Sequence, residues 1–267
     1  MTPGKESEMN IQERLYAEIA EKTARRITNG LAEWTAFLAF AGRLYKYPFD
    51  QQLMIYAQRP NALACASEEV WTKRMKLRIR WGSVSIPFVD NTGKTPVLRY
   101  VFDIADTEAG VGSRRPQLWQ YREECYGAAA NALERRFGHV DGEDMATKLE
   151  SISGRLAEEC WNDRRETVLE AVPGSFLEEL DALNVEVAFR RAASVSVAYA
   201  LMSRCGLELE ERFGHDDFLN VFDFNTAATV FALGNAVSDS VEQALREIEK
   251  AVKSYERVRT LSGDCYC

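Results

Sequence analysis

Apolar residues recur at helical spacing through the first sixty positions of the chain. Between residues 11 and 27 they repeat at intervals of four or eight, which predicts an amphipathic helix that Asn29-Gly30 would end. A second helix is predicted over 31–45, and its apolar residues on most sides indicate a buried position. A third is predicted over 50–58, because a proline at position 60 disfavours the α conformation just before it.

The pattern changes to two-residue alternation after residue 76. Arg78 and Arg80 alternate with apolar neighbours, which predicts a strand with cations on one face and apolar groups on the other. Such a strand is either a solvated edge that its charges protect from pairing, or a surface that binds anions. Segments 84–89 and 97–102 are also strand-like, and turn residues at 90–94 predict that they form a hairpin.

Most of the second half has helical patterning. The linker-like composition of 109–116 places a domain boundary there, so we expect an α+β domain over 1–112 and a mainly α-helical domain over 113–267. Ser175 and Glu178 predict a capping box, and Cys205-Gly206 predicts a helix end. The helices predicted in this half are 117–137, 143–171, 175–204, 226–235 and 238–259.

Charge distinguishes the two halves. The chain has 46% hydrophobic and 28% charged residues, as ordinary globular proteins do, and a net charge of −8. Residues 1–120 hold 17 Lys and Arg against 13 Asp and Glu, a balance of +4. The remaining residues hold 16 against 28, a balance of −12. Any bound nucleic acid would therefore contact the first half, and the acidic second half would face another kind of partner.

The sequence lacks the motifs that mark common catalytic and metal sites. The six cysteines form no CxxC pair, and HExxH, a glycine-rich phosphate loop and a nucleophile elbow are all lacking. His139 and His215 each precede acidic residues, but neither a third histidine nor a thiol pair completes a coordination set. We therefore expect no catalytic residue, no metal and no cofactor.

Targeting signals are also missing. No apolar run approaches the ~20 residues that span a bilayer, and the first residues lack the apolar core of a secretory signal. The expected location is the cytoplasm of a bacterial host cell, with no membrane partner.

Aromatic, amide and cationic side chains alternate from Arg43 to Pro60, and a second cationic run covers Lys73 to Trp81. Aromatic rings stack on unpaired bases and cations neutralise phosphates, so this mixture is typical of single-stranded nucleic-acid binding. The candidate DNA-binding residues are Tyr47, Phe49, Gln51, Arg59, Trp71, Lys73, Arg74, Lys76, Arg78, Arg80, Trp81 and Arg99.

Ordered landmarks run from Tyr47-Pro-Phe-Asp-Gln51 to Val101-Phe-Asp103 and Thr107. Together they resemble the N-terminal domain of ArdC-type antirestriction proteins. The resemblance implies single-stranded-DNA binding and a place on conjugative elements or phages. Pro48 and Gln51 stand where that family usually has Ser and Asn, and Ser83 stands where it has Glu. The landmarks are Tyr47-Pro-Phe-Asp-Gln51, Leu53-Met-Ile55, Gln58-Arg-Pro60, Trp71, Gly82-Ser-Val-Ser-Ile86, Val101-Phe-Asp103 and Thr107.

The second half resembles the helical part that follows this domain in large mobile-element proteins of Firmicutes. Segments 185–207 and 222–226 carry the resemblance, which extends distantly to the zinc-peptidase domain of ArdC itself. The position of the glutamate ligand in that domain corresponds to Val195 here, and HExxH is missing. The resemblance therefore implies a degenerate peptidase-like domain without protease activity.

Two functions from different classes remain. The first is a non-enzymatic antirestriction or wider anti-defence factor of a mobile element or phage, which binds single-stranded DNA through its first domain. The alternative is a protein-interaction inhibitor that does not bind DNA. Its acidic helical domain would bind a host restriction nuclease or CRISPR effector, as an anti-CRISPR protein does.

Overall fold

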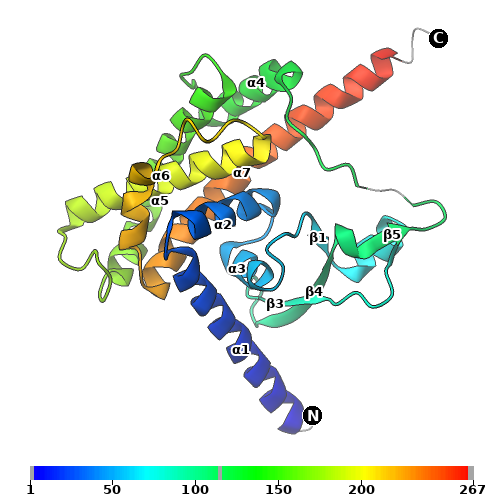
Figure 1. Cartoon of the computed structure of the whole chain (residues 1–267), viewed down its shortest axis with the longest axis horizontal. Coiled ribbons are helices and arrows are strands. Elements are labelled where there is room, and N and C mark those ends of the chain that lie inside the picture. The colour runs from blue at the N-terminus through cyan, green and yellow to red at the C-terminus, as the bar shows by residue number, and fades with distance from the viewer. Residues whose placement is uncertain (1–2, 114–115, 264–267) are drawn as a thin grey trace. The chain divides into compact units, whose positions relative to one another are not determined.

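A computed structural model describes residues 3–113 and 116–263, with side chains described for 14–113 and 116–260 (Figure 1). The chain forms two compact units, Met1–Gln117 and Leu118–Cys267. Helices predominate and the strands pair in antiparallel fashion, which confirms the predicted α+β class. Among the described residues, no helix has the length and apolar content needed to cross a bilayer.

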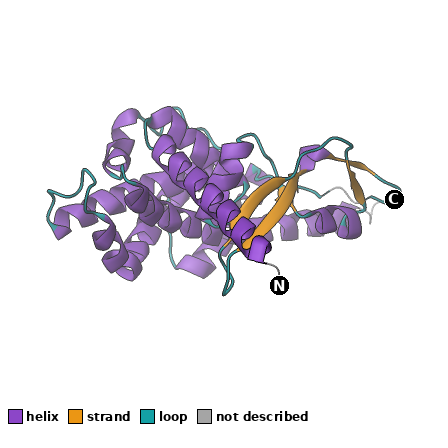
Figure 2. Cartoon of the chain, turned by 90° about the horizontal axis from the view of Figure 1, so that it is seen from below, coloured by secondary structure: helices purple, strands orange, loops and turns teal. Residues whose placement is uncertain are grey.

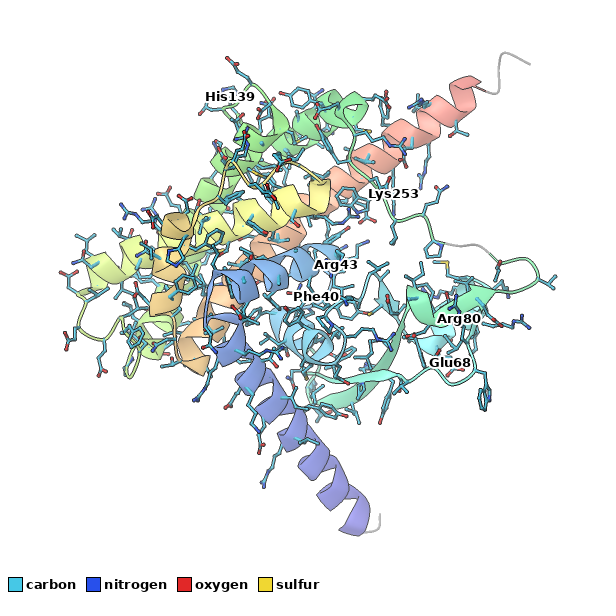
Figure 3. The ribbon with its side chains drawn as sticks, viewed as in Figure 1. Phe40, Arg43, Glu68, Arg80, His139 and Lys253 are labelled. Atoms are coloured by element: carbon cyan, nitrogen blue, oxygen red, sulfur yellow. The ribbon has the colours of Figure 1, made fainter. Side chains whose placement is uncertain are left out.

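Three helices build the core of the first unit. They are α1 (Pro3–Ile27), α2 (Leu31–Arg43) and α3 (Phe49–Gln58), so the predictions for the second and third hold, whereas the first begins well before residue 11. Phe37 of α2 meets Phe49 and Tyr56 of α3 edge-on, with ring centroids 5.6 and 5.4 Å apart. Phe40 and Arg43, on the same helix, are marked in Figure 3. This aromatic cluster joins α2 to α3.

A three-stranded antiparallel sheet lies against α3. Its order is β1-β4-β3, with β1 at Cys65–Ala66, β3 at Ile86–Asp90 and β4 at Val97–Asp103. The predicted hairpin is confirmed, because β3 and β4 pair from Ile86 opposite Val101 to Asp90 opposite Val97.

A separate ribbon of two short antiparallel strands follows (Figure 2). Strand β2 (Leu77–Ile79) comes after a π-helical turn, η1 (Val70–Arg74), and confirms the strand expected there. Its partner β5 (Thr107–Ala109) is joined to β4 by one 3₁₀ turn, η2 (Ile104–Asp106). The ribbon is thus a direct continuation of the main sheet's central strand.

The buried carboxylate of Asp103 fixes the junction between sheet and ribbon. Its Oδ1 accepts hydrogen bonds from the backbone amides of Leu63 (3.0 Å), Ala64 (2.9 Å) and Ile104 (2.8 Å). Only 2% of Asp103 is exposed, so water has little access to its carboxylate. The loop before β1 and the turn after β4 are therefore held by one side chain.

Asp106 extends this junction to α3. Its two carboxylate oxygens accept hydrogen bonds from Nη1 of Arg59 at 2.7 and 2.8 Å, and Oδ2 also accepts from the amide of Asp103 at 3.1 Å. The hydrogen bond to Asp106 raises the pKa of Arg59. The end of α3 and the start of the ribbon are consequently tied together.

Helices form nearly all of the second unit. They are α4 (Tyr126–Phe137), α5 (Met145–Ala171), α6 (Ala182–Cys205) and α7 (Ala227–Gly263), with 3₁₀ segments η3 (Glu123–Cys125) and η4 (His215–Asp223). Helices α5 and α6 pack along each other, and α7 contacts α4, α5 and α6. Gly206, in the left-handed conformation at φ 70°, ends α6 as predicted.

The helix predicted over 117–137 is wrong in its first part, because α4 begins only at Tyr126. Residues 118–122 are not helical. The guanidinium of Arg204 stacks on the indole of Trp119 at 3.7 Å, and its Nη2 donates to the Trp119 carbonyl at 2.8 Å. These contacts with a distant helix hold the segment in a non-helical conformation.

Two further helix boundaries differ from the predictions. Helix α6 begins at Ala182 rather than at 175, because Asp181 caps it through a 2.9 Å bond from the amide of Asn184. The hydroxyl of Ser175 instead donates to the Val172 carbonyl within a turn. The break predicted between 235 and 238 does not occur, since the buried face of α7 continues through both positions.

We expect Asp103→Leu to lower the free energy of unfolding by about 2 kcal/mol, because it removes the acceptor of the Leu63 and Ala64 amides, whereas the Ile104 amide keeps the Ala64 carbonyl. Asp103→Asn retains a carbonyl oxygen in place of Oδ1, so its free energy of unfolding should fall much less. Urea denaturation, followed by circular dichroism, measures both. Equal losses in the two variants would show that these amide bonds do not hold the junction.

Candidate nucleic-acid interface

The twelve candidate DNA-binding residues separate into a group that supports the fold and a group on the surface. Phe49 and Trp71 belong to the first, with exposures of only 1% and 3%. The Phe49 ring packs against Phe37, and the Trp71 indole Nε1 donates to the Phe102 carbonyl at 2.9 Å. Because neither ring face is open to a base, the stacking roles predicted for these two residues are corrected to core packing.

Tyr47 also serves the fold. Its hydroxyl donates to the carbonyl of Cys65 at 2.8 Å, and its ring meets Phe88 edge-on with centroids 5.9 Å apart. Burial raises the pKa of this phenol. The ring thus bridges β1 and β3, and it does not stand in solvent as a stacking platform would.

Three polar candidates are held by carboxylates. Gln51 Nε2 donates to Asp90 Oδ1 at 3.3 Å and Arg99 Nε donates to Asp90 Oδ2 at 3.1 Å, at the base of the hairpin turn. The hydroxyl of Thr92 is the main cause of the lowered pKa of Asp90. Arg59 makes its bonds to Asp106. These three side chains stabilise the hairpin and the junction.

The other six candidates form a continuous exposed stretch. We call residues 73–81 the cationic segment; it runs from the end of η1, along β2 and into the following turn. Arg80 is marked in Figure 3. The exposed candidates in this segment are Lys73, Arg74, Lys76, Arg78, Arg80 and Trp81.

Side chains of the cationic segment alternate between a buried face and an exposed face along β2. Leu77 is buried and Ile79 is half-buried, whereas Arg78 and Arg80 are exposed. The Arg80 amide donates to the Asp106 carbonyl at 2.8 Å, which extends the pairing of β2 with β5. The two arginines are therefore presented from a paired backbone, as the period-two pattern predicted.

Trp81 is the most unusual residue of the segment. It is fully exposed, whereas the other four tryptophans of the chain are at most 4% exposed. The next residue, Gly82, has φ 83°, a conformation that a side chain disfavours, so the turn holds the indole at the end of β2. A fully solvated indole is costly in water and offers both faces for stacking.

The chain enters β2 through a tight turn at Lys76, whose φ of 57° is rare for a residue with a side chain. Gly110 lies against this turn: a Cβ atom at Gly110 would come within 2.7 Å of the Lys76 carbonyl oxygen. Close backbone packing therefore fixes the turn from which the Lys76 side chain leaves the surface.

Electrostatically, the segment combines paired and unpaired cations. Lys73 pairs with Glu69 at 3.3 Å and Arg78 pairs with Glu108 at 3.2 Å, both on the exposed surface, where such pairs contribute little. Within the part of the chain that the structure describes, no acidic side chain pairs with Arg74, Lys76 or Arg80. All five cations are thus available to an incoming polyanion.

Sequence reasoning missed two apolar residues on the ribbon. Val84 is 72% exposed just after the Trp81 turn, and Val111 is fully exposed just after β5. Their only sequence signal is an apolar residue beside a glycine or serine in a turn, which many buried residues share. They add apolar surface on which bases or sugars can pack.

The two histidines belong to the second unit. His139, marked in Figure 3, contacts Asp141 at 3.4 Å, and His215 contacts Asp216 at 3.7 Å. Gly138 ends α4, and Gly214 begins η4. Among the described residues, no three His, Cys, Asp or Glu side chains converge in a way that would hold a metal.

No protein-family model matches the chain, and neither the curated proteins nor the solved structures contain a significant match to it. The resemblance to ArdC-type proteins accordingly stays a prediction. The case for an interface rests on the geometry of the cationic segment.

We expect Trp81→Phe to remove nearly all of the tryptophan emission that acrylamide quenches, because the other indoles are buried. The remaining emission should shift to shorter wavelength. Trp161→Phe, which removes a buried indole of the second unit, is the matched control and should leave the quenchable emission in place. Emission that stays equally quenchable in Trp81→Phe would contradict the exposure of this side chain.

Proposed function

We propose that the first unit binds single-stranded DNA through the cationic segment. The observation that carries this proposal is the fully exposed Trp81 next to five exposed cations on a paired strand and its flanking turns. Base-to-indole stacking supplies sequence-independent affinity, and lysine and arginine side chains neutralise the phosphates.

The exposed indole favours single strands over duplex. A base inside a duplex is already stacked on its neighbours, so an external ring gains contact only by unstacking it. A single strand presents its bases at no such cost. The alternating arginines of β2 then have a regular backbone from which to contact successive phosphates.

The biological role that we propose is that of a non-enzymatic antirestriction or wider anti-defence factor of a mobile element. Two arguments support it: the resemblance of residues 47–107 to ArdC-type antirestriction proteins, and the exposed cations and indole of the cationic segment. Conjugation transfers DNA as a single strand, and a protein bound to that strand would shield it.

We expect Arg78→Glu/Arg80→Glu to weaken binding of a labelled single-stranded oligonucleotide by roughly tenfold or more at low salt, because two cations become anions. Trp81→Ala should weaken it by about tenfold through loss of a stacked base, worth ~1–3 kcal/mol. Fluorescence anisotropy at two salt concentrations, with duplex competitor, measures both. For the unsubstituted chain, affinity should fall with salt and duplex should compete poorly.

The matched control is Lys22→Glu/Lys94→Glu. It makes the same change in net charge on exposed residues of α1 and of the β3–β4 loop, outside the cationic segment. The affinity of this control variant for the oligonucleotide should stay within about twofold of the affinity of the unsubstituted chain, because salt screens distant surface charges. An equal loss in both double variants would mean that net charge alone attracts the DNA, and it would refute the proposed interface.

We expect expression of the chain in a restriction-proficient recipient strain to raise the efficiency of conjugative transfer of an unmodified plasmid, which enters as a single strand, and Arg78→Glu/Arg80→Glu to abolish this protection. An isogenic strain without restriction is the control and should show no effect. If protection persists in Arg78→Glu/Arg80→Glu, protection does not depend on DNA binding. That result would favour the alternative, in which the chain binds and inhibits a host protein.

A further inference from the structure

Four large apolar side chains are exposed within twelve consecutive residues of the second unit. Phe176 is 71% exposed, Leu183 is 68% exposed, and Leu180 and Val187 are each about two-fifths exposed. Single exposed apolar residues are common on protein surfaces, but several together usually mark an interaction site. We call residues 176–187 the apolar patch.

The apolar patch is built from a turn and the first turns of α6. Its four residues are spaced by four, three and four positions, and Leu183 and Val187 lie one helical turn apart on the same face. The intervening Leu177 and Val185 are buried, which anchors the segment to the unit and leaves the other side outward. The Phe176 amide also donates to the side chain of Asn225 at 3.0 Å.

The surroundings of the apolar patch are acidic. Residues 170–187 contain five Asp and Glu and no Lys or Arg. The nearest arginine along α6, Arg190, is paired with Glu186 and Glu158, each at 3.2 Å. In contrast, Glu179 is exposed and has no basic partner within the described part of the chain. The rim therefore presents negative charge around an apolar centre.

This charge limits which molecule the patch fits. DNA, RNA and anionic membranes would meet repulsion from the rim, and a second copy docked patch to patch would oppose one set of carboxylates to another. A cationic protein surface has the complementary charge. The exposed ridge of Leu183 and Val187 is the shape that packs beside a partner helix with apolar residues at matching intervals.

We propose that the apolar patch docks a basic amphipathic helix of a partner protein. The apolar anchors of that helix pack on Leu180, Leu183 and Val187, and its lysines or arginines face the rim. This inference is independent of the proposed DNA binding, because every residue that carries it lies in the second unit.

The test uses the full chain and a labelled 18-residue amphipathic peptide of Leu and Lys, with apolar residues at helical spacing. A peptide of the same composition, scrambled to scatter its leucines around the helix, is the first comparison. We expect the scrambled peptide to bind at least about tenfold more weakly, the factor that corresponds to ~1.4 kcal/mol. Equal binding of the two peptides would show that the peptide's positive charge alone accounts for binding, and it would overturn the proposal.

Variants then locate the site. Leu183→Gln/Val187→Gln should weaken the ordered peptide about tenfold, whereas Leu219→Gln, an exposed apolar change on η4 beside two aspartates, should not. Glu179→Lys should weaken the Lys peptide and strengthen a version with Glu in place of Lys. Because all these side chains are exposed, circular dichroism should show unchanged folding; a correctly folded Leu183→Gln/Val187→Gln variant with unchanged affinity would refute the site.

Two further readouts separate this proposal from its competitors. Arg78→Glu/Arg80→Glu, which targets the DNA surface, should leave peptide binding unchanged, so the two proposals fail independently. Sedimentation of the unsubstituted chain is expected to show no self-association through the patch. A dimer that Leu183→Gln/Val187→Gln dissociates would overturn the partner helix in favour of a second copy.

Discussion

The buried carboxylate of Asp103 is the constraint on which the first unit depends. One oxygen accepts three backbone amides from segments about forty residues apart in the chain. The carboxylate itself is 2% exposed, so the fold must supply the donors that satisfy it. Asp106, one turn later, binds Arg59 and caps the same junction. The main sheet, the end of α3 and the start of the ribbon are thereby joined through two aspartates.

This junction explains why the cationic residues of the first unit have different roles. Arg59 is bound by the half-buried carboxylate that shapes the junction, whereas Arg99 forms a more exposed pair with Asp90 at the hairpin. Arg80 follows a strand whose backbone pairs with the junction itself, and its side chain leaves the surface. A paired backbone of this kind presents cations and an indole at set intervals, which a flexible basic tail does not do.

The two units offer surfaces of opposite chemistry. The ribbon of the first unit combines cations with Trp81, and the second unit combines carboxylates with the exposed apolar residues of 176–187. An overall charge of −8 hides this difference, because the first half is net basic and the second strongly acidic. The proposed partners have the complementary charges: a polyanion binds the first unit, and a basic helix binds the second.

Local pattern in the sequence determined the helices α2 and α3, the β3–β4 hairpin and the alternation along β2, since each depends on neighbours within a few residues. Only the tertiary structure decided which side chains remain exposed. Trp71 and Trp81 lie ten residues apart in similar basic surroundings, yet one donates to Phe102 in the core and the other stands in solvent. Likewise, Arg204 keeps residues 118–122 out of the helix that their own sequence favours. Burial, and tertiary contacts that oppose a local helix preference, depend on residues far away in the chain. Local periodicity carries no information about those residues.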